Sequence, residues 1–216
     1  CYNKITVKSF FRNIFNLMEI YEMSEVTTET MSPEIKEKSK FTTKDLAFTA
    51  LFAVIIAVCS WISIPTTIPF TMQTFAVFCA LGILGGKRGS AAVLVYIALG
   101  AVGLPVFAGF SSGFGVILGT TGGYIVGFLC SAVVYWVITA IFGNKLPVMI
   151  IAMVLGLFVC YAFGTAWFMI VYAKNTGDIG LLTALGWCVF PYIIPDLIKM
   201  ALAILITKRL AKHVSI

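Results

Sequence analysis

The chain has 216 residues, of which 60% are hydrophobic and only 11% are charged, and its mean hydropathy is +1.02. These values exceed those of a soluble domain and predict an integral membrane protein. The net charge of +6 would suit nucleic acid, but nearly all the charged residues lie in predicted loops and at the ends of the chain, which argues against that class of partner.

Residues 1–40 are a polar segment ahead of the apolar part of the chain. They hold six of the nine acidic residues and show little apolar periodicity, so we expect a disordered tail. The chain begins with cysteine, and Met23 opens a polar lead-in of ordinary length, which suggests that residues 1–22 are not native. The remaining residues, 41–216, form the predicted transmembrane domain.

The domain alternates between apolar stretches and short polar or Gly/Pro-rich connections. Each stretch has roughly the length that a helix needs to cross a hydrocarbon layer about 30 Å thick. A barrel would need strands of alternating polarity, and runs such as VMIIAMVLGLFV do not alternate. We therefore expect an all-α membrane protein with six transmembrane helices, at residues 44–63, 72–86, 89–104, 123–142, 147–172 and 191–208.

Basic residues near the predicted spans give the orientation. One side of the membrane receives only Lys174. The other side receives ten basic residues: Lys36, Lys38, Lys40, Lys44, Lys87, Arg88, Lys145, Lys208, Arg209 and Lys212. Since lysine and arginine concentrate on the cytoplasmic side, both termini should be cytoplasmic. The loops 64–71, 105–122 and 173–190 should then face outward.

The stretch between Gly100 and Gly127 is rich in glycine and carries no charge. Glycine allows close approach of the backbone to a small molecule, and it also allows close packing of membrane helices. We favour packing for Gly123 and Gly127, and ligand binding for residues 107–114. The aromatic and hydroxyl groups that this stretch offers to a ligand are Phe107, Phe110, Phe114, Tyr124, Ser111, Ser112 and Thr121.

Three further side chains are compatible with either a cavity or ordinary packing. Gln73 is a polar residue near the outer end of the second predicted span, where it can bind a ligand, cap the helix or bond a neighbouring span. Tyr161 and Trp167, in YAFGTAWF, can line a cavity or belong to the core. By themselves, these two aromatic residues fit the core better.

Asp196 and Lys199 are the most unusual feature of the sequence. Asp196 lies twelve residues from Lys208, about 18 Å along a helix, which is too deep for a surface charge. Lys199 lies on the same face. A lone charge at mid-membrane costs about 2.5–3.5 kcal/mol, against about 0.5 kcal/mol or less gained by an i,i+3 pair. We therefore favour a ligand or ion site facing the bundle interior.

Two other roles for this charged pair remain open. It can be a self-neutralising structural pair, if Pro195 stands at the first helical position and Asp196 in the first turn of the helix. It can also be a proton relay.

Several other classes of site are excluded. GILGGKRGS lacks the spacing of a phosphate-binding loop. The single histidine, His213, lies in the predicted cytoplasmic tail, which argues against a serine hydrolase at GFSSGFG. The cysteines of the apolar segments are scattered singly, and the sequence offers no carboxylate cluster for a metal. We expect no catalytic residue, no metal and no cofactor, so the protein should not be an enzyme.

Six stretches, in this order, resemble one known family: IPFTMQTFAV (68–77), GKRG (86–89), LGAVGLPVFAGFSSGFG (99–115), GTTGGYIVGF (119–128), YAFGTAW (161–167) and PDLIK (195–199). The family is BioY, the biotin-specific substrate-binding (S) components of energy-coupling factor (ECF) transporters. The resemblance covers about residues 44–212. It implies a six-helix S component in a bacterial plasma membrane that captures biotin from outside. Its partners would be a membrane scaffold (T) subunit and a pair of cytoplasmic ATPases that power release inward.

The resemblance also implies roles for particular residues. Asp196 and Lys199 would contact the ligand, and Ser112 lies in the segment that would close over it. Gln73 and Tyr124 fall in matching motifs. We expect Asp196 to accept a hydrogen bond from a ureido N–H and Lys199 to donate one to the ureido carbonyl. The thioether ring would be enclosed by Phe107, Phe110 and Trp167.

The first predicted span carries a stripe of small residues that permits close approach of another helix. The resemblance suggests that the scaffold docks there, and internal packing is the alternative. The stripe consists of Ala47, Ala50, Ala53 and Ala57. Alternative functions are an S component for another vitamin and a BioY-like transporter that works without the ATPases.

Overall fold

The computed structural model describes residues 42–66 and 68–210. The predicted polar tail at 1–40 and the prediction about residues 1–22 lie outside this range. Within it the chain is almost entirely helical. Its elements are α2 (Thr43–Trp61), β1 (Ser63–Ile64), β2 (Phe70–Thr71), α3 (Gln73–Ala101), a 3₁₀ turn η1 (Ala108–Phe110), α4 (Phe114–Leu118), α5 (Gly122–Phe142), α6 (Leu146–Asn175), α7 (Leu181–Cys188) and α8 (Phe190–Leu210).

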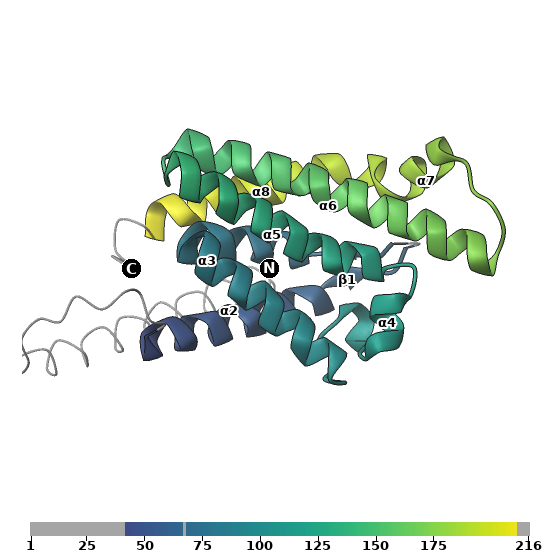
Figure 1. Cartoon of the computed structure of the whole chain (residues 1–216), viewed down its shortest axis with the longest axis horizontal. Helices are drawn as coiled ribbons and strands as arrows, with labels where there is room; N and C mark the ends of the chain where they lie inside the picture. The colour runs from purple at the N-terminus through teal and green to yellow at the C-terminus, as the bar shows by residue number, and fades with distance from the viewer. Residues whose placement is uncertain (1–41, 67, 211–216) are drawn as a thin grey trace, which may run out of the picture. The chain divides into compact units, whose positions relative to one another are not determined.

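The long helices form a bundle around α3. This helix packs against α2, α5 and α8, and α5 runs alongside α6 (Figure 1). The side chains where they meet are small or branched, including Ala76, Leu81, Ala92 and Val93, each at most 1% exposed. The buried face of α3 thus provides the centre against which the other helices pack.

Helix α3 contains both the second and the third predicted spans. Gly85 breaks it with a φ of 78°, a left-handed value that suits glycine. A Cβ placed on Gly89 would lie 2.9 Å from the Cα of Leu81, although eight residues of continuous helix would separate the two by about 12 Å. The chain therefore folds back on itself at Gly85. The five helical stretches of the described residues that can cross a membrane thus overlap all six predicted spans, with ends that differ by up to three residues at the first three.

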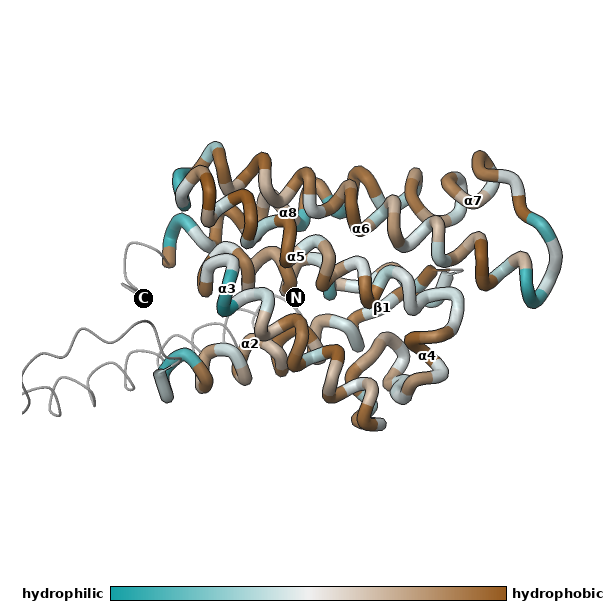
Figure 2. The backbone as a smooth tube through the Cα atoms, in the orientation of Figure 1, coloured by the Kyte–Doolittle hydropathy of each residue, from teal (hydrophilic) through white to brown (hydrophobic). Residues whose placement is uncertain are grey.

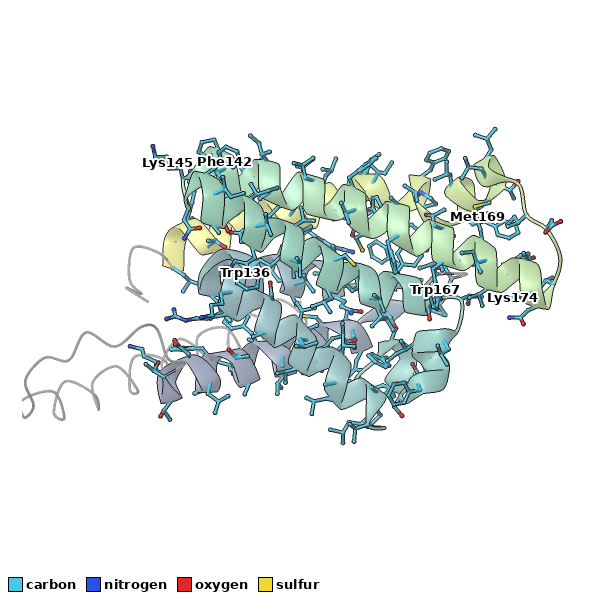
Figure 3. All side chains as sticks on the ribbon, viewed as in Figure 1. Trp136, Phe142, Lys145, Trp167, Met169 and Lys174 are labelled. Carbon is cyan, nitrogen blue, oxygen red and sulfur yellow. The ribbon has the colours of Figure 1, made fainter. Side chains whose placement is uncertain are left out.

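Polar residues lie at the two ends of the bundle. Hydrophobic residues dominate the middle of the helices, and hydrophilic ones gather at the ends (Figure 2). Lys145 and Lys174 lie at opposite ends of α6, as the orientation predicts (Figure 3). The start of α2 and the end of α8 lie at the same end (Figure 1). The protein is therefore a multi-pass membrane protein.

An ion pair fixes the start of α2 to the turn inside α3. Asp45 Oδ1 lies 2.7 Å from Arg88 Nε, and Asp45 is only 7% exposed. Asp45 also accepts a hydrogen bond from the backbone N–H of Thr42, which in turn caps the helix. These contacts hold the first helix to the hairpin of α3 at the end of the bundle that carries most of the basic residues.

Helix α8 begins at Phe190, which agrees with the predicted last span, 191–208. The outer connection 173–190 contains a further helix, α7, and Pro195 lies inside α8 rather than at its first position. A membrane helix tolerates an internal proline because neighbouring groups satisfy the freed carbonyl. Asp196 is therefore outside the first turn, and the helix-start explanation for the charged pair does not hold.

Candidate functional site

An interior cavity lies between α3, α5, α6 and α8, and residues of the 102–121 connection line its outer side. Its volume is about 150 Å³, roughly ten times what one water molecule requires. Most of its wall is apolar, and a few polar groups converge on it. Such a combination is typical of a small-molecule binding site.

Asp196 and Lys199 lie at this cavity as a bonded pair. Lys199 Nζ donates to Asp196 Oδ1 at 2.8 Å, and the two residues are 4% and 5% exposed. Neither side chain faces the surface of the bundle. A pair of opposite charges buried beside a cavity offers both a strong acceptor and a strong donor to a polar ligand.

Lys199 is held by two further contacts from the segment that precedes α3. Its Nζ donates to the Thr71 carbonyl at 2.6 Å and lies 3.9 Å from the centre of the Phe70 ring. Thr71 is paired with Ser63 in the short β1–β2 ladder. Tyr192, one turn N-terminal to Asp196 on α8, donates to the Ile68 carbonyl of the same segment. The lysine is thus fixed by the backbone of the outer segment as well as by its partner on α8.

Gln73 and Tyr124 both line the cavity. Gln73 is 4% exposed, and its amide nitrogen has no hydrogen-bond partner among the described residues. The Tyr124 hydroxyl lies 2.9 Å from Thr165 Oγ1. An unsatisfied buried amide costs free energy, so Gln73 is a ready donor for a ligand.

Phe107 forms the outer wall of the cavity. It is 1% exposed, and its ring lies over Gly100, where an added Cβ would come within 2.1 Å of Phe107 Cζ. The backbone of the same loop is tied to α3 by a 2.7 Å bond from Gly113 N to the Gly100 carbonyl. Only glycine at position 100 leaves room for the phenylalanine ring.

The remaining predicted contacts lie elsewhere. Phe110 is 62% exposed and stacks on Trp61 at 5.0 Å. Trp167 donates from its Nε1 to the Gly119 carbonyl at 3.0 Å and packs on Gly123, so it supports the loop from outside the cavity lining. Ser111 lines the cavity, and Ser112 does not.

The structure therefore brings Asp196, Lys199, Gln73, Tyr124 and Phe107 together, and leaves Phe110, Trp167 and Ser112 apart.

Tyr161 contacts the charged pair, which the sequence analysis did not anticipate. It donates from its hydroxyl to Asp196 Oδ2 at 2.6 Å and lines the cavity. Its sequence context favours a core aromatic residue, and only its motif linked it to a site. Its spacing to Asp196, 35 residues away on another helix, carries no signal in a single sequence.

The alanine stripe on α2 is divided between two environments. Ala47 and Ala50 are exposed, whereas Ala53 and Ala57 are 1% and 5% exposed and face the bundle. The expectation that all four alanines share one exposed stripe is therefore wrong: of the four, only Ala47 and Ala50 lie on the surface. The other two have the internal packing role that the sequence left as the alternative.

A bundle of membrane-crossing helices with a charged pair buried at an internal cavity defines a membrane protein that binds a small molecule. A sequence model of the BioY family matches residues 31–216 of this chain. The chain belongs to the BioY family.

Relatives and a solved structure agree with this assignment. A Biotin transporter BioY from Thermotoga maritima is 39% identical over 172 residues, which cover 78% of this chain and 96% of that protein. A Probable biotin transporter BioY from Pyrococcus horikoshii is 38% identical over 168 residues, with 77% and 96% covered. The crystal structure of the S-component for biotin from an ECF-type ABC transporter has a TM-score of 0.70 and 27% identity, with 79% of this chain and 92% of that chain covered.

Proposed function

We propose that the chain is the biotin-binding membrane subunit of an ECF-type vitamin transporter in a bacterial plasma membrane. The single observation that supports this most directly is the pair Asp196 and Lys199, buried together at an internal cavity. Membership of the BioY family, whose named relatives are biotin transporters, supports the choice of ligand. The chain is therefore a transport protein and not an enzyme.

The groups of the cavity complement a cyclic urea. The Asp196 carboxylate has about four lone-pair sites, and two are used by Lys199 and Tyr161, which leaves two for ureido N–H groups. Lys199 has three donors and uses two for Asp196 and Thr71, which leaves one for the ureido carbonyl. The amide of Gln73 supplies a further donor. A ligand without matching groups would leave these polar atoms unpaired and would bind far more weakly.

The apolar part of the ligand fits the rest of the wall. Phe107 and Tyr124 offer flat surfaces to the thioether ring. Ser111, at the outer side of the cavity, lies where a chain that leaves the ring system toward the outside would pass. In this account the outer connection 102–121 covers biotin after its entry from outside.

The partners of an S component are a scaffold (T) subunit and two cytoplasmic ATPases. We place scaffold docking on the exposed face of α2 that contains Leu46, Ala47, Ala50 and Val54. The two alanines allow another helix to approach closely, and the two larger residues are 64% and 55% exposed and would be covered by the contact.

The test is to purify the chain in detergent and identify any co-purified small molecule by mass spectrometry, followed by equilibrium binding of biotin. Saturable binding of one biotin per chain is the expected result. Preference for another vitamin would contradict the assignment of the ligand. Biotin uptake by cells that lack the scaffold subunit would instead show a transporter that works alone.

A further inference from the structure

Tyr161 connects two helices at the charged pair. It belongs to α6, and its hydroxyl donates to Oδ2 of Asp196 on α8, while Lys199 bonds Oδ1 of the same carboxylate. Each oxygen of Asp196 therefore has one bond to the protein. Because two different side chains hold the two oxygens, the plane of the carboxylate is fixed before any ligand arrives.

Tyr161 also lies between two hollows. On one side is the cavity that contains Asp196 and Lys199. On the other is an apolar groove of about 530 Å³ formed by residues of α6, α7 and α8, with Phe158, Leu185 and Ile193 in its wall. Among the described residues, only Leu157 and Tyr161 line both. The tyrosine ring is thus part of the partition between a polar cavity and an apolar groove.

The direction of the hydrogen bond restricts what Tyr161 can do for a ligand. Its single O–H proton is donated to Asp196, so its oxygen can only accept from a third group. A ligand that meets this edge of the cavity must bring a donor, such as the N–H of a cyclic urea. A ligand with an ether oxygen in that place would face two acceptors, the tyrosine oxygen and the carboxylate.

We propose that Tyr161 is a positioning residue that holds Asp196 for the ligand and makes this edge of the cavity selective for N–H donors. The inference rests on the proposed function, because it concerns the same ligand. Tyr161 would then affect which ligands bind, whereas a tyrosine that only packs in the core would not.

The test compares Tyr161→Phe with the wild type and with Tyr172→Phe, both in the full chain. Tyr161→Phe removes one oxygen and keeps the ring in the partition. Tyr172 is a control on the same helix, since its ring packs against Phe168 and Trp187 and is not part of the cavity wall. The ligands are biotin and two analogues in which one or the other ureido N–H is replaced by oxygen, so that the ring becomes a cyclic carbamate with an acceptor in place of a donor. Binding is measured by displacement of labelled biotin.

We expect Tyr161→Phe to weaken biotin binding about ten- to a hundredfold, as for loss of a hydrogen bond to a charged group. It should also reduce the ratio of the affinity for biotin to that for at least one analogue, whereas Tyr172→Phe should leave that ratio unchanged. Equal binding by Tyr161→Phe and wild type, or the same loss for all three ligands, would overturn the inference. No binding by the wild type would instead contradict the proposed function.

Discussion

The Tyr124 ring packs directly against the backbone of Gly164 on the neighbouring helix. A Cβ added to Gly164 would lie 2.4 Å from Tyr124 Cδ1, closer than any real contact, so the ring would have to move. Tyr124 in turn bonds Thr165 and lines the cavity. The shape of the cavity at this point therefore depends on the absence of a side chain at position 164.

This contact predicts that Gly164→Ala weakens biotin binding by about tenfold or more, because the displaced ring narrows the cavity. Equilibrium binding in detergent measures the effect. Gly186→Ala is the matched control, since nothing lies within 4 Å of a Cβ added there. Wild-type affinity in the Gly164 variant would show that Tyr124 does not shape the binding site.

Removal of the Gln73 amide should weaken biotin binding without lowering the stability of the protein. Its nitrogen is buried without a partner among the described residues, so Gln73→Leu should leave the ligand-free melting temperature unchanged or higher. The same change should weaken biotin binding about tenfold.

Ser90→Ala is the matched control for Gln73→Leu, because its hydroxyl is also buried and unpartnered in the described part of the chain but lies outside the cavity wall. It should leave the affinity unchanged. An unaltered affinity in Gln73→Leu would mean that the amide does not meet the ligand.

If the scaffold subunit docks on the exposed face of α2, a large side chain introduced on that face should prevent docking. Ala50→Trp should abolish co-purification of the scaffold while biotin binding persists, since Ala50 is exposed and distant from the cavity wall. Ala140→Trp, at an exposed alanine of α5, should have no effect. Normal yields of scaffold with Ala50→Trp would place docking on another surface.

Hydropathy was enough to predict the helices because the bilayer demands long apolar segments whose backbone groups bond internally. It also identified the charged pair, since charged side chains within a membrane span are costly and are usually kept for a function. The predicted last span, 191–208, agrees with α8. The alternative that put Pro195 at a first helical position failed because a proline pattern alone does not show whether the helix already continues before it.

The site was harder to predict because contacts between helices leave no local pattern. Phe107 and Phe110 are three residues apart in one loop, yet the left-handed φ of 57° at Phe110 helps to turn its ring outward onto Trp61. The alanine stripe showed which residues are small without showing which side of α2 faces the bundle. Tyr161 was not assigned to the charged pair because its partner is on another helix.

The charged pair at the cavity is the central claim, and equilibrium biotin binding by Asp196→Asn and Lys199→Met tests it most directly. Each change removes one charged group that would contact the ligand and leaves the opposite charge buried without a counter-ion, so each should weaken binding about a hundredfold or more. Lys208→Met, on the same helix beyond the cavity, should bind like the wild type. Wild-type affinity in both the Asp196 and the Lys199 variants would contradict the account.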